Sequence, residues 1–431
     1  MKISRSKFAA TVVAATAVVS LAACGGGGDA ASSGKTTITL LTDNAETTVK
    51  PAKAIAEAFE KANPTITVKL ESRPGGADGD NLVKTKLSTG DMADVFWYNS
   101  GSLLQALSPE KNLVDLTGDA ALKDTDPAFL PTVTQNGKVY GAPVGTVMGG
   151  GILYNKEVYS KLGLSVPKTW AEFESNSDKI KAAGLTAVVG SFKDTWTSQL
   201  FVLGDFHNVA SANPSFAADY TANKVKYATD PTAVKGFEKT AEAKARGWLN
   251  KSAGSTTFDQ GMKLLASGKA GQYPLLTFPV GTLSKADAAK IGFFGIPGDD
   301  ASKNGATIWP GNGQYIPKTS KNIDAAKKFI AFVASPAGSE VYSSAAPPTG
   351  PYMVTGSKVP ADAPPVAQDL QAYIDAKATT PALEFLSPVK GPSLEQITVA
   401  VETGQTSGKD GAAQYDADVT KQAKQLGLPG W

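Results

Sequence analysis

The sequence predicts an α/β fold with mostly parallel sheets. Near the start of the folded body, strand, helix and strand patterns follow one another within residues 36–71, and the alternation resumes further along the 431-residue chain. The composition is 42% hydrophobic and 19% charged, which is typical of a globular protein with a substantial core. The length suits two ordinary domains, and no linker rich in Gly, Ser or Pro divides residues 36–431.

The first predicted unit is a strand, a helix and a second strand. Residues 36–41 (TTITLL) are apolar and β-branched, which favours a strand. Residues 49–62 place Ile55 and Phe59 at helical spacing, and residues 65–71 (TITVKLE) alternate as a half-buried strand does. Such a unit joins two parallel strands through a right-handed crossover.

The same patterns predict the later elements. We expect helices at residues 81–89, 170–183 and 325–333, and strands at residues 93–98, 185–189, 270–273, 291–296 and 306–316.

The N-terminus has the layout of a secretory signal followed by a lipid attachment site. Residues 1–7 are basic, and residues 8–23 are apolar but too few for a comfortable membrane span. The run Leu21-Ala22-Ala23-Cys24 resembles the bacterial lipobox, in which the cysteine becomes the lipidated first residue. Ordinary cleavage beside an incidental cysteine is the alternative.

These features predict where the protein works. We expect residues 1–23 to be a signal peptide and residues 24–35 to be a flexible tether, since residues 25–34 are rich in Gly, Ala and Ser. A lipid on Cys24 would hold the folded body at the outer face of the cell membrane or in the periplasm.

Charge disfavours two classes of partner. Without the three basic residues of the leader, the chain has 39 basic and 40 acidic residues, so electrostatics indicates no binding to nucleic acid or to an anionic membrane. Arginine occurs only at positions 5, 73 and 246. Because arginine is the usual clamp for carboxylates and phosphates, its scarcity favours a neutral ligand, although lysine can also bind an anion.

The single cysteine, Cys24, and the single histidine, His207, restrict the chemistry. They exclude a disulfide within the chain and a Cys/His zinc cluster. A Ser-His-Asp site would depend on His207 alone, which lies among apolar residues and suits a structural role. No Walker A sequence is present. We therefore expect no catalytic residue, no metal and no cofactor.

Aromatic and polar residues recur together where predicted strands end. In open α/β sheets, ligands bind beyond the carboxyl ends of the strands. Aromatic rings can stack on the apolar faces of a sugar, while Asp, Asn and Ser can bond its hydroxyl groups. The predicted ligand-binding residues at these positions are Asp43, Asn44, Trp97, Asn99, Ser100, Asp194, Trp196, Phe278, Trp309 and Asn312.

Structural roles remain open for several of these residues. Asp43 also suits the cap of the helix at 49–62, and Asn99 or Ser100 suits the cap of the next helix. Aromatic side chains at strand ends can also fill an interface between domains. Trp170 and Trp248, in contrast, are expected to pack in the core.

Several segments resemble one family in their residues and in their order. The similar segments are residues 86–96 (KLSTGDMADVF), 141–143 (GAP), 152–157 (ILYNKE), 167–173 (PKTWAEF), 266–270 (ASGKA) and 316–321 (IPKTSK). Each is weak alone, but together they resemble the extracellular sugar-binding proteins of bacterial ABC importers, the family typified by maltose-binding proteins.

The resemblance implies a two-lobed periplasmic-binding-protein fold of type II, with a hinge and discontinuous lobes. Crossings are expected near residues 141–148, 306–313 and 347–352. Lobe 1 is then residues 36–143 and 310–348, and lobe 2 is residues 144–309 and 349–431. The lobes would close around a ligand in the cleft between them.

The family also implies roles for particular residues. Residues 97–100 fall where members line the first lobe, and Trp196 and Phe278 fall where members stack aromatic rings from the second. Phe278 departs from the tryptophan common there. Residues 144–151 lack the acidic residue that some members carry, so recognition would use backbone groups or packing by Met148.

The expected function is non-enzymatic capture of a neutral mono- or oligosaccharide. A monomer would deliver it to ABC permease subunits driven by a cytoplasmic ATPase. A secreted glycosidase is the alternative, and it needs two carboxylates facing one bond; Asp43, Asp94, Asp194 and Glu384 are the nominees. The same fold binding a polyamine or another small polar solute is a third hypothesis.

Overall fold

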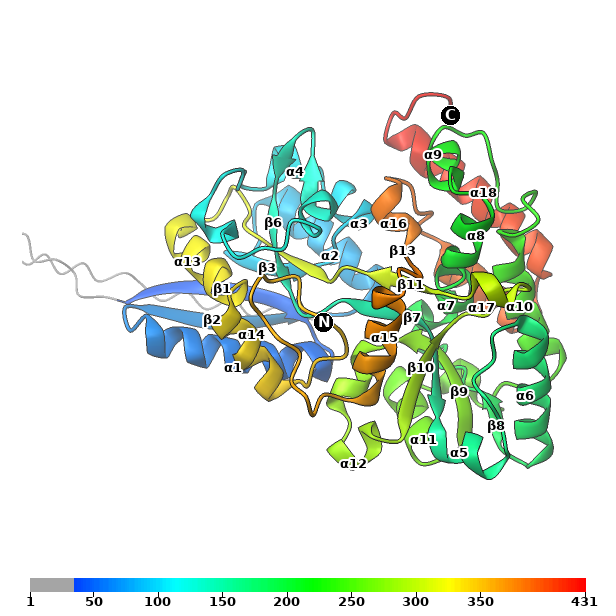
Figure 1. Ribbon diagram of the computed structural model, residues 1–431. Helices are drawn as coiled ribbons and strands as arrows, with labels where there is room; N and C mark the ends of the chain where they lie inside the picture. The colour runs from blue at the N-terminus through cyan, green and yellow to red at the C-terminus, as the bar shows by residue number, and fades with distance from the viewer. Residues whose placement is uncertain (1–34) are drawn as a thin grey trace, which may run out of the picture. The chain divides into compact units, whose positions relative to one another are not determined.

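Two β-sheets organise residues 35–431, the part of the chain that the computed structural model describes (Figure 1). The predicted signal peptide, Cys24 and residues 25–34 of the tether lie outside the described residues. Within the described part, no helix combines the length and the hydropathy needed to cross a membrane.

The first sheet consists of β2 (Ile66–Arg73), β1 (Thr36–Asp43), β3 (Val95–Tyr98), β12 (Asn312–Tyr315) and β6 (Gly141–Val144), in that spatial order. β1 pairs in parallel with β2 and with β3. β12 runs antiparallel to both of its neighbours.

The first sheet packs against α1 (Glu46–Ala62) and α13 (Ile323–Val333). Phe59 of α1 and Phe329 of α13 meet edge to face, with ring centroids 5.1 Å apart, in a core shared with Ile38 and Leu40 of β1. The other elements of this half are α2 (Gly76–Thr89), α3 (Ser102–Gln105), α4 (Pro109–Asn112), α14 (Pro336–Ala345), the short helices η1 (Ala120–Leu122) and η2 (Leu130–Val133), and the hairpin of β4 (Thr134–Gln135) and β5 (Lys138–Val139).

The second sheet is built around its long strand β7 (Met148–Asn155). β9 (Ala270–Leu276) pairs with one edge of β7, and β10 (Ile291–Gly295) and β11 (Ala306–Trp309) pair with the other edge. β8 (Thr186–Val188) pairs in parallel with β9, and β13 (Thr379–Pro381) pairs in parallel with β11.

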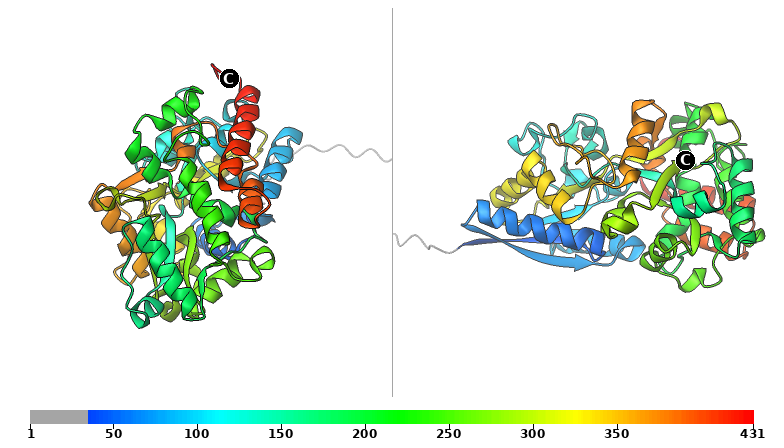
Figure 2. Two further views of the ribbon diagram at one scale, coloured as in Figure 1. Left: turned by 90° about the vertical axis from the view of Figure 1, so that its right-hand side faces the viewer. Right: turned by 60° about the horizontal axis from the view of Figure 1, so that its bottom comes forward.

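Helices surround the second sheet, and α18 (Gly408–Gln425) lies at its outer side (Figure 2). The remaining elements of this half are α5 (Lys156–Lys161), α6 (Trp170–Ala182), η3 (Thr195–Gln199), α7 (Leu200–Leu203), α8 (Phe206–Ala212), α9 (Phe216–Thr221), α10 (Val234–Ala245), η4 (Ala253–Ser255), α11 (Phe258–Ala266), η5 (Phe278–Thr282), α12 (Lys285–Ala288), η6 (Ala301–Lys303), α15 (Pro365–Asp375), α16 (Leu383–Leu386) and α17 (Leu394–Glu402).

The α/β class is confirmed, but the expectation of mostly parallel sheets is wrong. β7 is antiparallel to β9, β10 and β11, and β12 is antiparallel to both of its partners. Both sheets are therefore mixed, because strands returning from the other half of the fold enter each sheet in the reverse direction.

The predicted helices and strands are found, with two informative differences. The helix expected at residues 81–89 begins earlier, as α2 at Gly76, and ends at Thr89; Gly90 follows as its cap, with a left-handed φ of 76°. The strand expected at residues 306–316 is interrupted at Pro310 and Gly311, and its two parts belong to different sheets.

The chain passes between the sheets at closely spaced segments. Residues 145–147 connect β6 to β7, and residues 310–311 connect β11 to β12. Gly145 and Gly311 have φ values of 78° and 105°, which are unfavourable for residues with a Cβ. Residues 346–364 make a further connection, in which Tyr352 bridges to Thr146.

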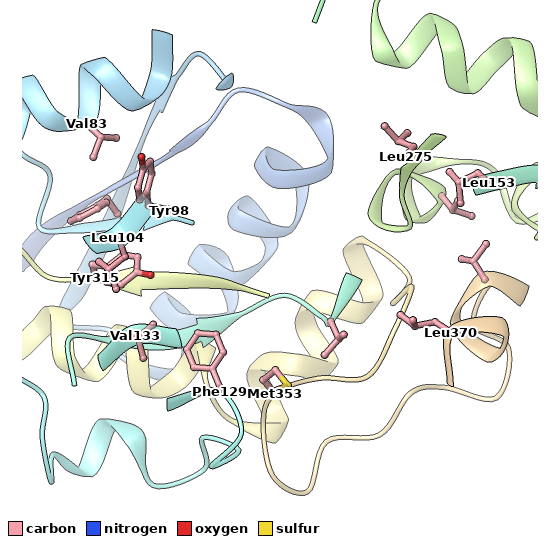
Figure 3. Packing of buried hydrophobic residues seen from close by; sticks show 14 of the residues in the cluster. Val83, Tyr98, Leu104, Phe129, Val133, Leu153, Leu275, Tyr315, Met353 and Leu370 are labelled. Carbon is pink, nitrogen blue, oxygen red and sulfur yellow. The ribbon is translucent and has the colours of Figure 1, made fainter. Parts of the chain in front are cut away.

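One hydrophobic cluster draws residues from both halves of the fold. Figure 3 shows Tyr98 and Leu104 beside the first sheet and Leu153 and Leu275 at the second. Met353, in the connection of residues 346–364, belongs to the same cluster. The two halves are therefore joined by side-chain packing as well as by the backbone.

Glu402, at the end of α17, is a buried carboxyl group. It is 4% exposed, and its Oε2 accepts no hydrogen bond from any described residue. It lines a small internal cavity with Ser191, Ser198 and Tyr273. Burial raises the pKa of Glu402 well above its ordinary value, because a charged carboxylate is poorly solvated there.

Replacing Glu402 with Gln should reduce the pH dependence of the free energy of unfolding. With a raised folded-state pKa, the carboxyl stabilises the fold fully below its unfolded pKa, and this contribution is lost as the pH rises through the folded pKa. Relative to the unchanged protein, E402Q should therefore become more stable by about 1 kcal/mol or more as the pH rises above about 4. Urea unfolding across this range measures the effect.

The exposed Glu57 of α1 provides the control, because E57Q removes a carboxylate that lies in water. Identical pH profiles for E402Q and the unchanged protein would contradict the interpretation.

Candidate functional site

A cavity of about 580 Å³ is lined by residues from both halves of the fold. Its walls include residues at the ends of β1, β3 and β12 of the first sheet, and residues of β7, β9 and β11 of the second. Of the predicted ligand-binding residues, Asp43, Trp97, Asn99, Met148, Trp196, Phe278, Trp309 and Asn312 line this cavity. The fold therefore brings together, at one cavity, residues that are distant in sequence and that the strand-end rule had selected.

Trp309 is held by a glycine and a glutamate. The indole lies so close to Gly150 of β7 that a Cβ there would be 2.1 Å from Trp309 Cζ3. The indole N–H donates a hydrogen bond to Oε1 of Glu384 on α16. The ring is 6% exposed and lines the cavity, so both its position and its orientation are determined by the surrounding protein.

Trp196 belongs to an aromatic group on the second sheet's side of the cavity. Its ring stacks near Phe278, with centroids 6.1 Å apart, and packs against Phe258 at 5.8 Å. Asp194, at the start of η3, accepts a hydrogen bond of 2.7 Å from the backbone N–H of Phe258. Thr195 donates a hydrogen bond of 2.6 Å to Glu395 of α17. These contacts fix the segment that carries Trp196.

On the first sheet, β3 contributes Trp97 and Tyr98. The Nε1 of Trp97 and the hydroxyl of Tyr98 are buried and have no hydrogen-bond partner among residues 35–431. The guanidinium carbon of Arg73 lies 5.3 Å from the centre of the Tyr98 ring. Burial, with a smaller effect from the charge of Asp80, raises the pKa of Tyr98 well above its ordinary value, so its hydroxyl stays protonated.

The helix cap considered for Asp43 is not formed, because the N-cap residue of α1 is Ala45 and no side chain among the described residues caps this helix end by hydrogen bonding. The Asp43 carboxylate accepts hydrogen bonds of 2.9 Å from the backbone N–H of Ala45 and from the hydroxyl of Thr48, at the start of α1. Asp43 also lines the cavity. The bonds from Ala45 and Thr48 therefore hold this carboxylate at the cavity wall.

Three of the predicted residues do not line the cavity. Asn44 is exposed just beyond β1. Ser100 is 2% exposed and donates a hydrogen bond of 2.9 Å to the carbonyl of Gly311, so it joins β3 to a crossing segment. Asp194 is engaged by the backbone of Phe258. The last two support the cavity from behind its wall.

The sequence reasoning missed most of the charged residues in the cavity wall. These residues are Arg73, Asp80, Lys84, Lys390 and Glu395; Glu384 also lines the wall and was considered only as a glycosidase nominee. Arg73 ends β2, so the strand-end rule could have found it. Glu384 and Lys390 follow β13, a three-residue strand containing a proline that no sequence pattern indicated.

Acidic residues elsewhere are used structurally. Asp94 accepts hydrogen bonds from Thr39, Ser320 and Asn322, and it does not line the cavity. Within the described part of the chain, no group of three or more His, Cys, Asp or Glu side chains is placed to hold a metal ion.

Comparison with known proteins gives consistent results. The family model described as "Bacterial extracellular solute-binding protein" matches residues 44–340, more than half of the chain. The chain is 28% identical to the multiple sugar-binding protein of Streptococcus mutans over 71% of each protein. It is 25% identical to the melibiose/raffinose/stachyose-binding protein of Bacillus subtilis, also over 71% of each.

Solved structures show the same fold at lower sequence identity. A chitin oligosaccharide binding protein superimposes with a TM-score of 0.78 at 19% identity, over 90% of this chain and 100% of that one. A raffinose complex of the binding protein RafE gives a TM-score of 0.74 at 24% identity, over 89% of this chain and 100% of that one. From the family match and these likenesses, the chain belongs to the bacterial extracellular solute-binding proteins.

Proposed function

We propose that this protein is the substrate-binding lipoprotein of an ABC importer and that it captures a neutral carbohydrate between two closing lobes. The observation that carries the proposal is the single cavity in which Trp97, Trp196 and Trp309 share the walls with hydrogen-bonding side chains from both sheets. Indole rings suit the apolar faces of sugar rings, and the polar groups suit their hydroxyls.

The charges of the cavity wall support a neutral ligand. Four acidic and three basic side chains line the cavity. Several of them have internal partners: Lys390 Nζ lies 3.7 Å from Glu384 Oε2, and Glu395 accepts the hydroxyl of Thr195. Because the positive and negative charges of the wall are nearly equal in number and several have partners within the protein, the cavity has no strong preference for an anion or a cation.

The lobes proposed here are residues 36–143 with 310–348, and residues 144–309 with 349–431. Motion would occur at the short crossings, where residues 145–147 and 310–311 lie outside the strands. A ligand that contacts both lobes favours the closed arrangement, because only that arrangement makes both sets of contacts.

The setting follows from the N-terminus and the family. Lipid on Cys24 would anchor a monomer outside the cytoplasm, where it delivers sugar to permease subunits. The names of the relatives point to melibiose, raffinose and stachyose as the first sugars to test. The protein would bind without turnover, in contrast to a glycosidase.

Sugar binding should raise the melting temperature. A ligand that binds only the folded protein stabilises it by about 2.7 kcal/mol at a concentration one hundred times its Kd. Thermal-shift measurements with melibiose, raffinose, stachyose, maltotriose and monosaccharides measure the effect, and chromatography of the incubated sugars tests for products. New products would favour the enzyme, and stabilisation by a polyamine or by a sugar phosphate alone would contradict the neutral-sugar proposal.

Gly150→Ala should weaken sugar binding. The new Cβ would overlap the Trp309 indole at 2.1 Å, so the ring must move and its stacking surface is lost. Loss of a good aromatic contact corresponds to about 1 kcal/mol or more, so we expect the Kd from titration calorimetry to rise about fivefold or more. Gly254→Ala is the matched control, because no atom lies within 4 Å of the added Cβ. Equal affinities for G150A and G254A would refute the role given to Trp309.

Cys24→Ser in the full-length protein should abolish lipid attachment. The chain has one cysteine, so incorporation of labelled palmitate into the unchanged protein reports on that residue alone. We expect label and membrane fractionation for the unchanged protein, and neither for C24S. Equal membrane fractionation of the two proteins would argue against the lipid anchor.

A further inference from the structure

Glu384 is placed to do more than support an aromatic ring. It lies on α16, its residue exposure is 6%, and its Oε1 accepts the N–H of Trp309. Its other oxygen, Oε2, is buried and receives no hydrogen bond from any described residue. Lys390 Nζ lies 3.7 Å from Oε2, beyond ordinary hydrogen-bonding distance.

The Oε2 atom of Glu384 can therefore still accept hydrogen bonds. Each oxygen of an ionised carboxylate can accept about two hydrogen bonds. A buried acceptor left without any partner is costly, and one that lines a ligand cavity can be satisfied by the ligand. Glu384, Lys390 and Trp309 all line the same cavity, so this carboxylate lies beside the space that a ligand would occupy.

The bond to Trp309 places this carboxylate relative to a stacked sugar. An acceptor of the indole N–H lies at the edge of the ring, beside its five-membered part. A sugar stacked on an indole carries its hydroxyl groups around its rim, in the direction of that edge. A hydroxyl donating to an ionised carboxylate forms a charge-assisted bond, which is stronger than one between neutral groups.

We propose that Glu384 is a two-sided recognition residue, whose Oε1 orients Trp309 while its Oε2 accepts one hydroxyl of the sugar stacked there. The inference rests on the proposed carbohydrate function. Lys390 keeps the buried carboxylate beside a positive charge without occupying the acceptor site. The ligand class that follows is a sugar with a free hydroxyl beyond the indole edge, and a sugar lacking that hydroxyl binds more weakly.

Glu384 also contacts the first half of the fold through its backbone. Its carbonyl oxygen would be 2.5 Å from a Cβ on Gly101, the residue that precedes α3. The same residue therefore packs near the end of β3 and holds a ring on β11. Sugar bound to Oε2 would stabilise an arrangement that spans both sheets.

The test is Glu384→Gln, with affinity measured by titration calorimetry for the best sugar and for its single-deoxy analogues. Gln can still accept the N–H of Trp309, but a neutral amide replaces the anionic acceptor. We expect the Kd of the parent sugar to rise about tenfold to a hundredfold. The analogue that lacks the hydroxyl bonded to Glu384 should bind the unchanged protein weakly. Its affinity should fall little further in E384Q, because the missing hydroxyl and the substitution remove the same hydrogen bond.

Glu402→Gln is the matched control, a buried glutamate of the same half of the fold that lies outside this cavity, and its affinity should equal that of the unchanged protein. Because the chain has six Trp residues, the fluorescence of Trp309 is obtained as the difference between E384Q and the same protein with Trp309→Phe, and it reports whether the indole environment persists. If E384Q does not fold, Lys390→Met keeps the carboxylate, and the hydroxyl dependence should then persist.

The outcomes separate the two levels of the proposal. Equal affinity of E384Q and the unchanged protein, or losses in E384Q that are uniform across all deoxy analogues, would overturn the role of Glu384 while leaving sugar binding intact. If no sugar binds the unchanged protein, the proposed function fails and this inference fails with it.

Discussion

The pairing of strands on either side of two short crossings is the constraint on which the cavity depends. In the first sheet β6 pairs with β12, and in the second sheet β7 pairs with β11. Between these pairs the chain is outside the strands for only residues 145–147 and 310–311. The two sheets are therefore held close together, and side chains at the ends of their strands converge on one space.

The cavity owes its chemistry to side chains that the protein itself holds in place. Trp309 is positioned by Gly150 and Glu384, and Trp196 belongs to a segment fixed by Asp194 and Glu395. Rigid rings lose little conformational freedom when a ligand arrives, so more of the contact energy remains as affinity. Preorganisation of this kind suits a protein that must bind a strongly hydrated solute.

The sequence predicted the elements better than their directions. Alternation and helical spacing located β1, α1, β2 and α13, because each buries one face. Strand direction is set by long-range pairing, which periodicity does not report, so the mixed sheets were missed. The interruption at Pro310 and Gly311 was visible, but its meaning as a passage between sheets depended on the fold.

The candidate site was predicted in part for the same reason. Trp97 and Trp309 lie near the ends of recognisable strands, Trp196 comes after one, and all three line the cavity. Glu384 and Lys390 follow β13, whose three residues include Pro381 and carry no clear strand pattern. Ser100 and Asp194 have the right chemistry and position in sequence, but their side chains bond to neighbouring backbone. The sequence can identify such a residue, but it does not show whether the side chain faces the cavity or bonds to the protein's own backbone.

The three successive glycines of β7 have a further consequence. On one face, Gly149 and Gly151 leave room for the ring of Phe293; on the other, Gly150 leaves room for Trp309. Glycine gives a strand little intrinsic stability and has no side chain to pack. The rings of Phe293 and Trp309, from neighbouring strands, fill the space that side chains of β7 would otherwise occupy. Trp309 is therefore both a buried part of the second sheet's packing and a part of the cavity wall. A substitution that reshapes this wall of the cavity would therefore also alter the protein's resistance to unfolding.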